Sequence, residues 1–167
     1  MDVKSYIKIP NVLMTDDFMS RPEDFFVDID DAERLKVIAD KLDINYIEGA
    51  IVVSLHGNNI LDYSLWDLVG ATWAYLMNAI EEFLEKGKSH MYFPDQPIRI
   101  EMEEKGRGHI KLVIGNGEYG SHVLPREELF NALINGAEHF FWIIKKEMET
   151  DKFDFHLEQI KSIKRNL

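Results

Sequence analysis

Two aspartates one residue apart close an apolar run near the N-terminus, in the stretch "FFVDIDDAERL" (Phe25 to Leu35). Enzymes that form an aspartyl-phosphate place their nucleophile and general acid in such a pair, at the tip of a central parallel strand. That chemistry also needs a second acidic pair on later strands to hold Mg²⁺, and no parallel alternation of strands and helices follows here. "DDAE" instead matches a capping box, in which Asp30 accepts a hydrogen bond from the amide of Glu33. The sequence therefore predicts that a helix begins at Asp30.

The other motifs with chemical potential lack the context that their chemistry needs. "GNGEYG" (115–120) matches the glycine pattern of dinucleotide-binding loops, but an extended stretch and Pro125 follow where a helix should begin, so we predict a hairpin turn. The chain has six histidines without close pairing and no cysteine. His109 and His122 could lie on neighbouring strands, yet two ligands do not make a metal site. We expect no catalytic residue, no metal site and no cofactor.

Composition restricts the class of protein. A chain of 167 residues that is 46% hydrophobic fits one domain with a substantial core. Without cysteine it has no disulfide or thiolate zinc site, which suits a reducing compartment. The N-terminal "MDVKSYIKIP" has no apolar signal region, and acidic residues interrupt the apolar stretch 61–84. We therefore expect a soluble, cytoplasmic protein.

The net charge of −11 is concentrated near the N-terminus. Between Asp16 and Glu33 there are eight acids and one base, Arg21. Such a field repels nucleic acid and anionic membranes, and it speeds the encounter with basic protein partners. A solvated acidic loop that only aids solubility is the simpler alternative.

Hydrophobic periodicity predicts an α+β fold in one domain over residues 1–167, with an acidic, partly irregular segment at about 11–33. The expected sheet is antiparallel, with a meander at 97–124 joined by N-terminal strands and a hairpin, and two long helices pack on one of its faces. The expected elements outside the meander are a strand at Val3–Ile9, a helix from Asp30, hairpin arms at Ile51–Leu55 and Ile60–Tyr63 around a turn at 57–59, and helices at Ser64–Lys86, from Pro125, and at Phe155–Arg165. Trp66 and Trp73 share one stripe of the helix at 64–86, so we expect core positions rather than a ligand pocket.

Two surfaces are candidates for partner binding. The first is the acidic segment, with Asp16, Asp17, Glu23, Asp24, Asp28 and Asp31 as its charges and Phe18 as an apolar anchor. Phe25 and Phe26 are further possible anchors, and two of these three phenylalanines could instead fill the core. The second is the polar face of the meander, formed by Arg99, Glu101, Glu103, His109 and Lys111. Glu101 and Glu103 share a strand face like a catalytic carboxylate pair, but pairing with basic strand neighbours explains them more simply.

The order of "GAIVVSLHGNNILDY", "LWDLVGATWAYLMNAIEEFLEKG", "FPDQPIRIEM" and "LPREELFNALINGAEHFFWII" resembles small bacterial immunity proteins of polymorphic-toxin systems. Several of their groups combine a tryptophan-bearing helix, a meander that opens after a "P-I" step, and a closing helix that ends in paired phenylalanines. The resemblance spans about residues 49–144. It implies a cytoplasmic, non-catalytic inhibitor that occludes a cognate toxin, and it assigns no residue by position.

Two other classes of function stay open. One is an enzyme that acts on a small ligand or through a metal, with a site assembled from distant residues such as His109, His122 and a carboxylate. The other is an oligomerising structural domain, in which the segment 16–33 packs against a second copy.

Overall fold

The computed structural model describes all of residues 1–167, which form an α+β fold with two antiparallel sheets and four α-helices. The strands of the first sheet, sheet A, are β1 (Asp2–Lys8), β2 (Phe26–Asp28), β3 (Glu48–Leu55), β4 (Asn58–Leu61) and β5 (Asp67–Leu68). Those of the second, sheet B, are β6 (Lys88–Tyr92), β7 (Arg99–Gly106), β8 (His109–Ile114) and β9 (Gly120–Pro125). The helices are α1 (Ala32–Ala39), α2 (Val69–Lys86), α3 (Arg126–Glu147) and α4 (Asp154–Asn166), with short 3-10 turns η1 (Pro22–Asp24), η2 (Tyr63–Leu65) and η3 (Gly115–Gly117).

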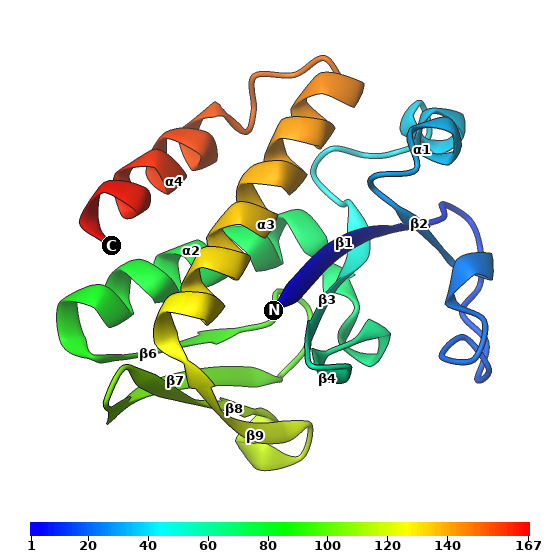
Figure 1. The fold of residues 1–167 in the computed structure, drawn as a ribbon. Helices are drawn as coiled ribbons and strands as arrows, with labels where there is room; N and C mark the ends of the chain where they lie inside the picture. The colour runs from blue at the N-terminus through cyan, green and yellow to red at the C-terminus, as the bar shows by residue number, and fades with distance from the viewer.

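The helices lie where both sheets can share one core. Sheet A has the strand order β2-β1-β3-β4 with β5 beside β3, and sheet B is the meander β6-β7-β8-β9. Helix α2 contacts strands of both sheets, α3 lies against α2 and β1, and α4 packs on α2 and α3 (Figure 1). Trp73, Phe130 and Phe140 are completely buried in this core. None of the helices combines the length and apolarity needed to cross a bilayer.

The predicted meander is confirmed, and it is one strand wider than expected. Ile100, Met102 and Ile114 face the core while Glu103 and His109 face solvent, as strict alternation predicts. The strand that the sequence does not reveal is β6, because its inward positions include the polar Ser89. The residues of η3 supply the positive φ angles of the β8–β9 turn, so "GNGEYG" is a turn between antiparallel strands.

The predicted N-terminal hairpin belongs to a separate sheet rather than to the meander's sheet. Its turn also differs from the prediction: His56 and Gly57 take the positive φ angles, whereas Asn58 and Asn59 already pair within β4. The strand at β1 agrees with the prediction to within one residue at each end.

The helix predicted over Ser64–Lys86 begins five residues later than expected. Asp62 caps the turn η2, and β5 then pairs with β3 through Gly49 and Asp67, which holds the backbone extended up to Leu68. Trp66 therefore lies outside the helix, half-buried on the other side of sheet A, and the prediction that it shares the core with Trp73 is wrong.

The helix start near Asp30 is shifted by one residue. Asp31, not Asp30, is the N-cap of α1, and its carboxylate accepts a hydrogen bond from the amide of Arg34 (3.1 Å). A turn closed by Asp28, whose Oδ1 accepts from the Asp30 amide (3.0 Å), sets this register. Asp30 instead contacts His139 Nε2 on α3 at 2.5 Å. β2, which holds Asp28, is an antiparallel edge strand, unlike the central parallel strand of an aspartyl-phosphate enzyme.

Candidate partner-binding site

The face of sheet A that points away from the main core carries a cluster of large apolar side chains. Ile7 faces the core, so its strand neighbours Tyr6 and Lys8 face outward. We call this group the aromatic cluster; it consists of the buried Phe25, Phe26 and Ala50 and the half-buried Tyr6, Val12, Met14, Phe18, Tyr63 and Trp66. The Tyr63 ring lies 4.9 Å from that of Tyr6 and 5.1 Å from that of Phe26. The Lys8 ammonium sits 5.2 Å from the centre of the Trp66 ring.

The acidic segment contributes Val12, Met14 and Phe18 to this cluster, and it also carries apolar side chains that are exposed to solvent. Leu13 is 86% exposed and Met19 is 43% exposed, although the sequence pattern of this irregular segment did not single them out. Phe18 is half-buried, so its edge remains available to a partner. Phe25 and Phe26 are only 5% and 2% exposed, which makes them core residues and not anchors.

Intramolecular pairing neutralises several of the predicted acids. Arg21, the one base of the segment, contacts Asp17 at 2.5 Å and Asp24 at 3.1 Å. A hydrogen bond from the Thr15 hydroxyl and the Arg21 guanidinium lower the pKa of Asp17 below its ordinary value. Asp28 pairs with Lys4 on β1 at 3.3 Å, and this carboxylate raises the pKa of Lys4.

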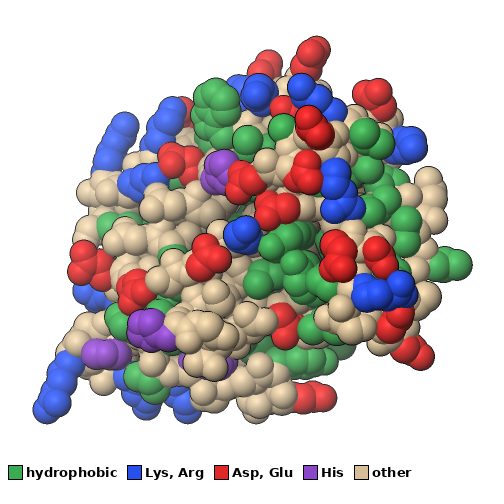
Figure 2. Space-filling model, turned by 45° about the vertical axis from the view of Figure 1, so that its right-hand side comes forward, with side chains coloured by type: hydrophobic (Ala, Val, Ile, Leu, Met, Phe, Trp, Pro, Cys, Tyr) green, Lys and Arg blue, Asp and Glu red, His purple; other side chains and the backbone are tan.

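Unpaired negative charge remains at Asp16, Glu23 and Glu33. These side chains are exposed, and their carboxylates make no hydrogen bond or ion pair within the chain. Figure 2, which brings this side of the molecule forward, shows acidic side chains around a hydrophobic area. We call the combination of Asp16, Glu23 and Glu33 with the exposed parts of Leu13, Phe18 and Met19 the acidic face.

The polar face of the meander is a separate surface on sheet B, away from the acidic segment (Figure 1). Arg99 pairs with Glu101 at 2.9 Å, and Lys105 lies 3.9 Å from Glu103, so both predicted acids have basic neighbours. Lys111 is half-buried opposite Glu103 in the β7–β8 register. The fold thus does not bring the two predicted surfaces together.

The two histidines considered as metal ligands do lie on neighbouring strands, but out of register. His109 is opposite Pro125 and His122 is opposite Leu112. The chain contains no group of three or more histidine or acidic side chains with the spacing of a metal site.

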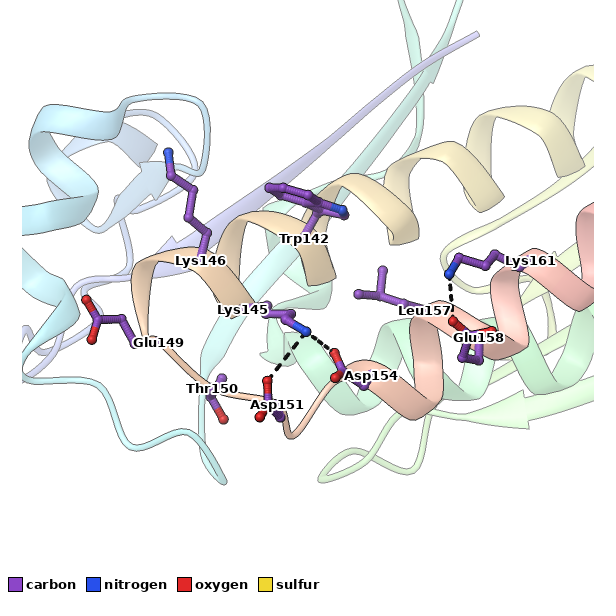
Figure 3. Close-up of a pocket in the computed structure, with 10 residues that line it drawn as sticks. All are labelled: Trp142, Lys145, Lys146, Glu149, Thr150, Asp151, Asp154, Leu157, Glu158 and Lys161. Carbon is purple, nitrogen blue, oxygen red and sulfur yellow. Dashed lines mark hydrogen bonds and ion pairs between the residues drawn. The ribbon is translucent and has the colours of Figure 1, made fainter.

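A cleft of about 730 Å³ lies between the end of α3 and the start of α4 (Figure 3). Its charged walls pair internally: Lys145 contacts Asp151 at 3.5 Å and also Asp154, and Lys161 contacts Glu158 at 2.6 Å. Trp142 stands at the rim and is 60% exposed. Lys145 of α3 thus pairs with Asp154 of α4 and with Asp151 of the connecting loop, which gives these three residues a structural role.

Asp67 is a buried carboxylate that sequence patterns did not reveal. It is 5% exposed and accepts hydrogen bonds from the amides of Leu68 (2.6 Å) and Asp95 (3.2 Å). Gln96 Nε2 approaches it at 3.4 Å and donates to the Trp66 carbonyl at 2.6 Å. These contacts attach the turn before β7 to the start of α2 and hold Trp66 at the edge of the aromatic cluster.

His156 on α4 is a second partly buried titratable group. Its ring stacks on Phe141 at 4.8 Å, and burial lowers the pKa of this histidine below the ordinary value of 6.5. Because the unfolded chain then binds more protons than the folded chain, the free energy of unfolding falls as the pH drops through about 6.5. We expect His156→Phe to reduce the loss of thermal stability between pH 7.5 and 5.5, as measured by calorimetry. His90→Phe, which removes an exposed histidine, is the matched control, and an unchanged pH dependence in His156→Phe would contradict this expectation.

Comparison with known proteins adds no relative to this description: no family model, no curated protein and no solved structure matches the chain. The acidic face therefore rests on its own geometry. It combines unpaired carboxylates and exposed apolar side chains with Phe18, which packs against residues of sheet A.

Proposed function

We propose that this chain is a non-catalytic binding protein that captures a basic protein partner on the acidic face, and that it acts as an immunity protein which occludes a cognate toxin in the cytoplasm. The observation that carries the proposal is the combination, within residues 13–23, of the exposed and unpaired acids Asp16 and Glu23 with Leu13 and Met19, which are exposed although apolar. Scattered single apolar residues are normal on a surface, but several of them together with unpaired acids in one short segment fit a binding site.

The two kinds of side chain would make different contributions. Unpaired carboxylates attract a basic surface over a distance of about 8–10 Å at moderate ionic strength and raise the association rate. Apolar anchors such as Phe18 and Met19 would supply most of the affinity once water is excluded around them. Asp17 and Asp24 could exchange Arg21 for an arginine or lysine of the partner, at little cost because surface ion pairs are weak.

Charge reversal on the acidic face tests the proposal. We expect Asp16→Lys/Glu23→Lys to slow association with the proposed cognate toxin by roughly 10- to 100-fold at low salt, since electrostatic steering commonly changes association rates over this range. The measurement is surface plasmon resonance with the purified toxin, together with survival of cells that express both proteins.

Glu85→Lys/Glu149→Lys is the matched control, because both acids are exposed and unpaired and lie outside the segment 11–33. It produces the same change in net charge at another place. Equal losses in the two double variants would show that net charge alone matters, and unimpaired rescue by Asp16→Lys/Glu23→Lys would overturn the proposal.

A further inference from the structure

β9 is an edge strand with one side open along its length. It pairs with β8 in an uninterrupted register, and no strand pairs with its other side. The amide of Arg126 donates to the Gly108 carbonyl at 2.8 Å, so in this antiparallel ladder the even-numbered residues direct their backbone groups toward β8. Ser121 and Val123 therefore direct their N–H and C=O groups outward. Pro125 is also at an outward-directed position, where its missing N–H costs no hydrogen bond to β8.

The other sheet edges carry features that discourage pairing with a further strand. β2 has only three residues and includes the charged Asp28. The β3–β4 pair is bulged between Val53 and Ser54, and β6 runs beside α2 and exposes Lys88. β9 has neither a charged residue nor a bulge, and Val123 is 61% exposed. Long, uncharged and regular edges are the ones that recruit another strand.

We propose that β9 pairs with β9 of a second copy, so that two four-stranded sheets join into one continuous sheet around a two-fold axis. The register places Ser121 opposite Val123 of the other copy and His122 on the axis. Each Ser121–Val123 pair then exchanges two backbone hydrogen bonds, because both residues direct their groups outward.

The charges near the ends of β9 favour a second copy of this chain as the partner of the strand. The antiparallel register sets the strand end that carries Glu118 beside the opposite end, which carries Arg126, so unlike charges meet at both ends. The acidic segment packs on sheet A, so its repulsive charges stay away from this contact.

Proline at an outward position tests the pairing directly. We expect a dimer dissociation constant on the order of 10–100 µM, because one strand pair buries less surface than a typical stable protein–protein interface. Val123→Pro removes only the outward N–H and should raise this constant at least tenfold in sedimentation equilibrium, while Val123→Thr, which keeps the N–H, should not. Circular dichroism confirms that each variant is folded. A wild-type chain that stays monomeric into the millimolar range, or a folded Val123→Pro that still dimerises normally, overturns the proposal.

Single cysteines test the register, since the chain contains no cysteine of its own. In a non-hydrogen-bonded pair on the axis the Cα atoms lie about 4.5 Å apart, so His122→Cys should form a disulfide-linked dimer under mild oxidation. In a Ser121→Cys or Val123→Cys dimer, the two equivalent cysteines are offset from each other by two residues along the paired strands. Their Cα atoms are then more than about 7 Å apart, so these variants should cross-link poorly. The reverse pattern overturns this register. Toxin neutralisation is a separate readout, because Val123→Pro should leave the acidic face intact.

Discussion

Replacing Gly49 with alanine is expected to lower the free energy of unfolding by about 3 kcal/mol, at the upper end of the usual cost of overpacking. Gly49 lies in β3 opposite Ile7 of the paired strand β1. The two strands are so close there that a Cβ atom on Gly49 would lie 2.0 Å from the carbonyl oxygen of Tyr6. That oxygen belongs to the backbone, so relief requires the two strands to separate. The effect is measured by urea denaturation with the m-value as a check on two-state unfolding.

Gly70→Ala is the matched control for Gly49→Ala. Gly70 lies in the first turn of α2, and the nearest atom to its Cβ position is 3.8 Å away on Phe140. There alanine should leave stability unchanged or raise it by up to about 1 kcal/mol, because glycine loses more backbone entropy in a helix. If Gly49→Ala costs no more than Gly70→Ala, then β1 and β3 do not approach each other as described.

The Gly49 substitution should also disturb the acidic face. Tyr6 and Ala50 flank the crowded contact and both belong to the aromatic cluster. Movement of β1 away from β3 would therefore shift the Tyr6 ring relative to Tyr63. We expect weaker near-ultraviolet circular dichroism and reduced partner binding in the folded fraction of Gly49→Ala.

Truncation of Trp73 should have the largest effect of any core substitution, with Trp73→Ala lowering the free energy of unfolding by about 3–5 kcal/mol. The ring is completely buried in α2, and Cη2 would lie 3.0 Å from a Cβ at Gly136 of α3. Its Nε1–H donates to the Ser5 hydroxyl of β1 at 3.0 Å. One side chain thus joins two helices and a strand, and its loss leaves a cavity at their junction.

A double-mutant cycle separates the hydrogen bond from the packing of Trp73. Ser5→Ala leaves the buried indole N–H without an acceptor and should cost about 1–3 kcal/mol. Trp73→Phe removes the donor together with part of the ring. Because the double variant leaves neither group unpaired, its cost should be below the sum of the single costs by about 1 kcal/mol. Strict additivity in denaturant unfolding would mean that the Trp73–Ser5 bond contributes nothing.

The elements that the sequence predicts well are those whose pattern is local. Alternation in β7 and β8, and the apolar stripe of α3 through Phe130 and Phe141, repeat at the period of the structure that they form. Pro125 marks the start of α3, and Gly87 ends α2 with a φ of +69°. In these stretches the burial of one face and the local backbone preference favour the same conformation.

The candidate site was predictable in its composition but not in its arrangement. The sequence identifies the acids of the segment and Phe18, since these are simply counted along the chain. It does not reveal that Lys4 from β1 and His139 from α3 pair with Asp28 and Asp30, because those partners are distant in sequence. Which acids remain free follows from these contacts together with the pairing of Arg21 with Asp17 and Asp24.

The sequence by itself determined an α+β chain with an acidic N-terminal segment, two long amphipathic helices and a regular meander. The tertiary structure decided that the strands divide into two sheets, that β2 and β6 exist, that Trp66 leaves the helix, and that Phe25 and Phe26 are core residues. The physical reason is that a short strand gains its stability from the neighbour with which it pairs. That neighbour, like the partner of each buried or charged side chain, is chosen by contacts between residues far apart in the chain.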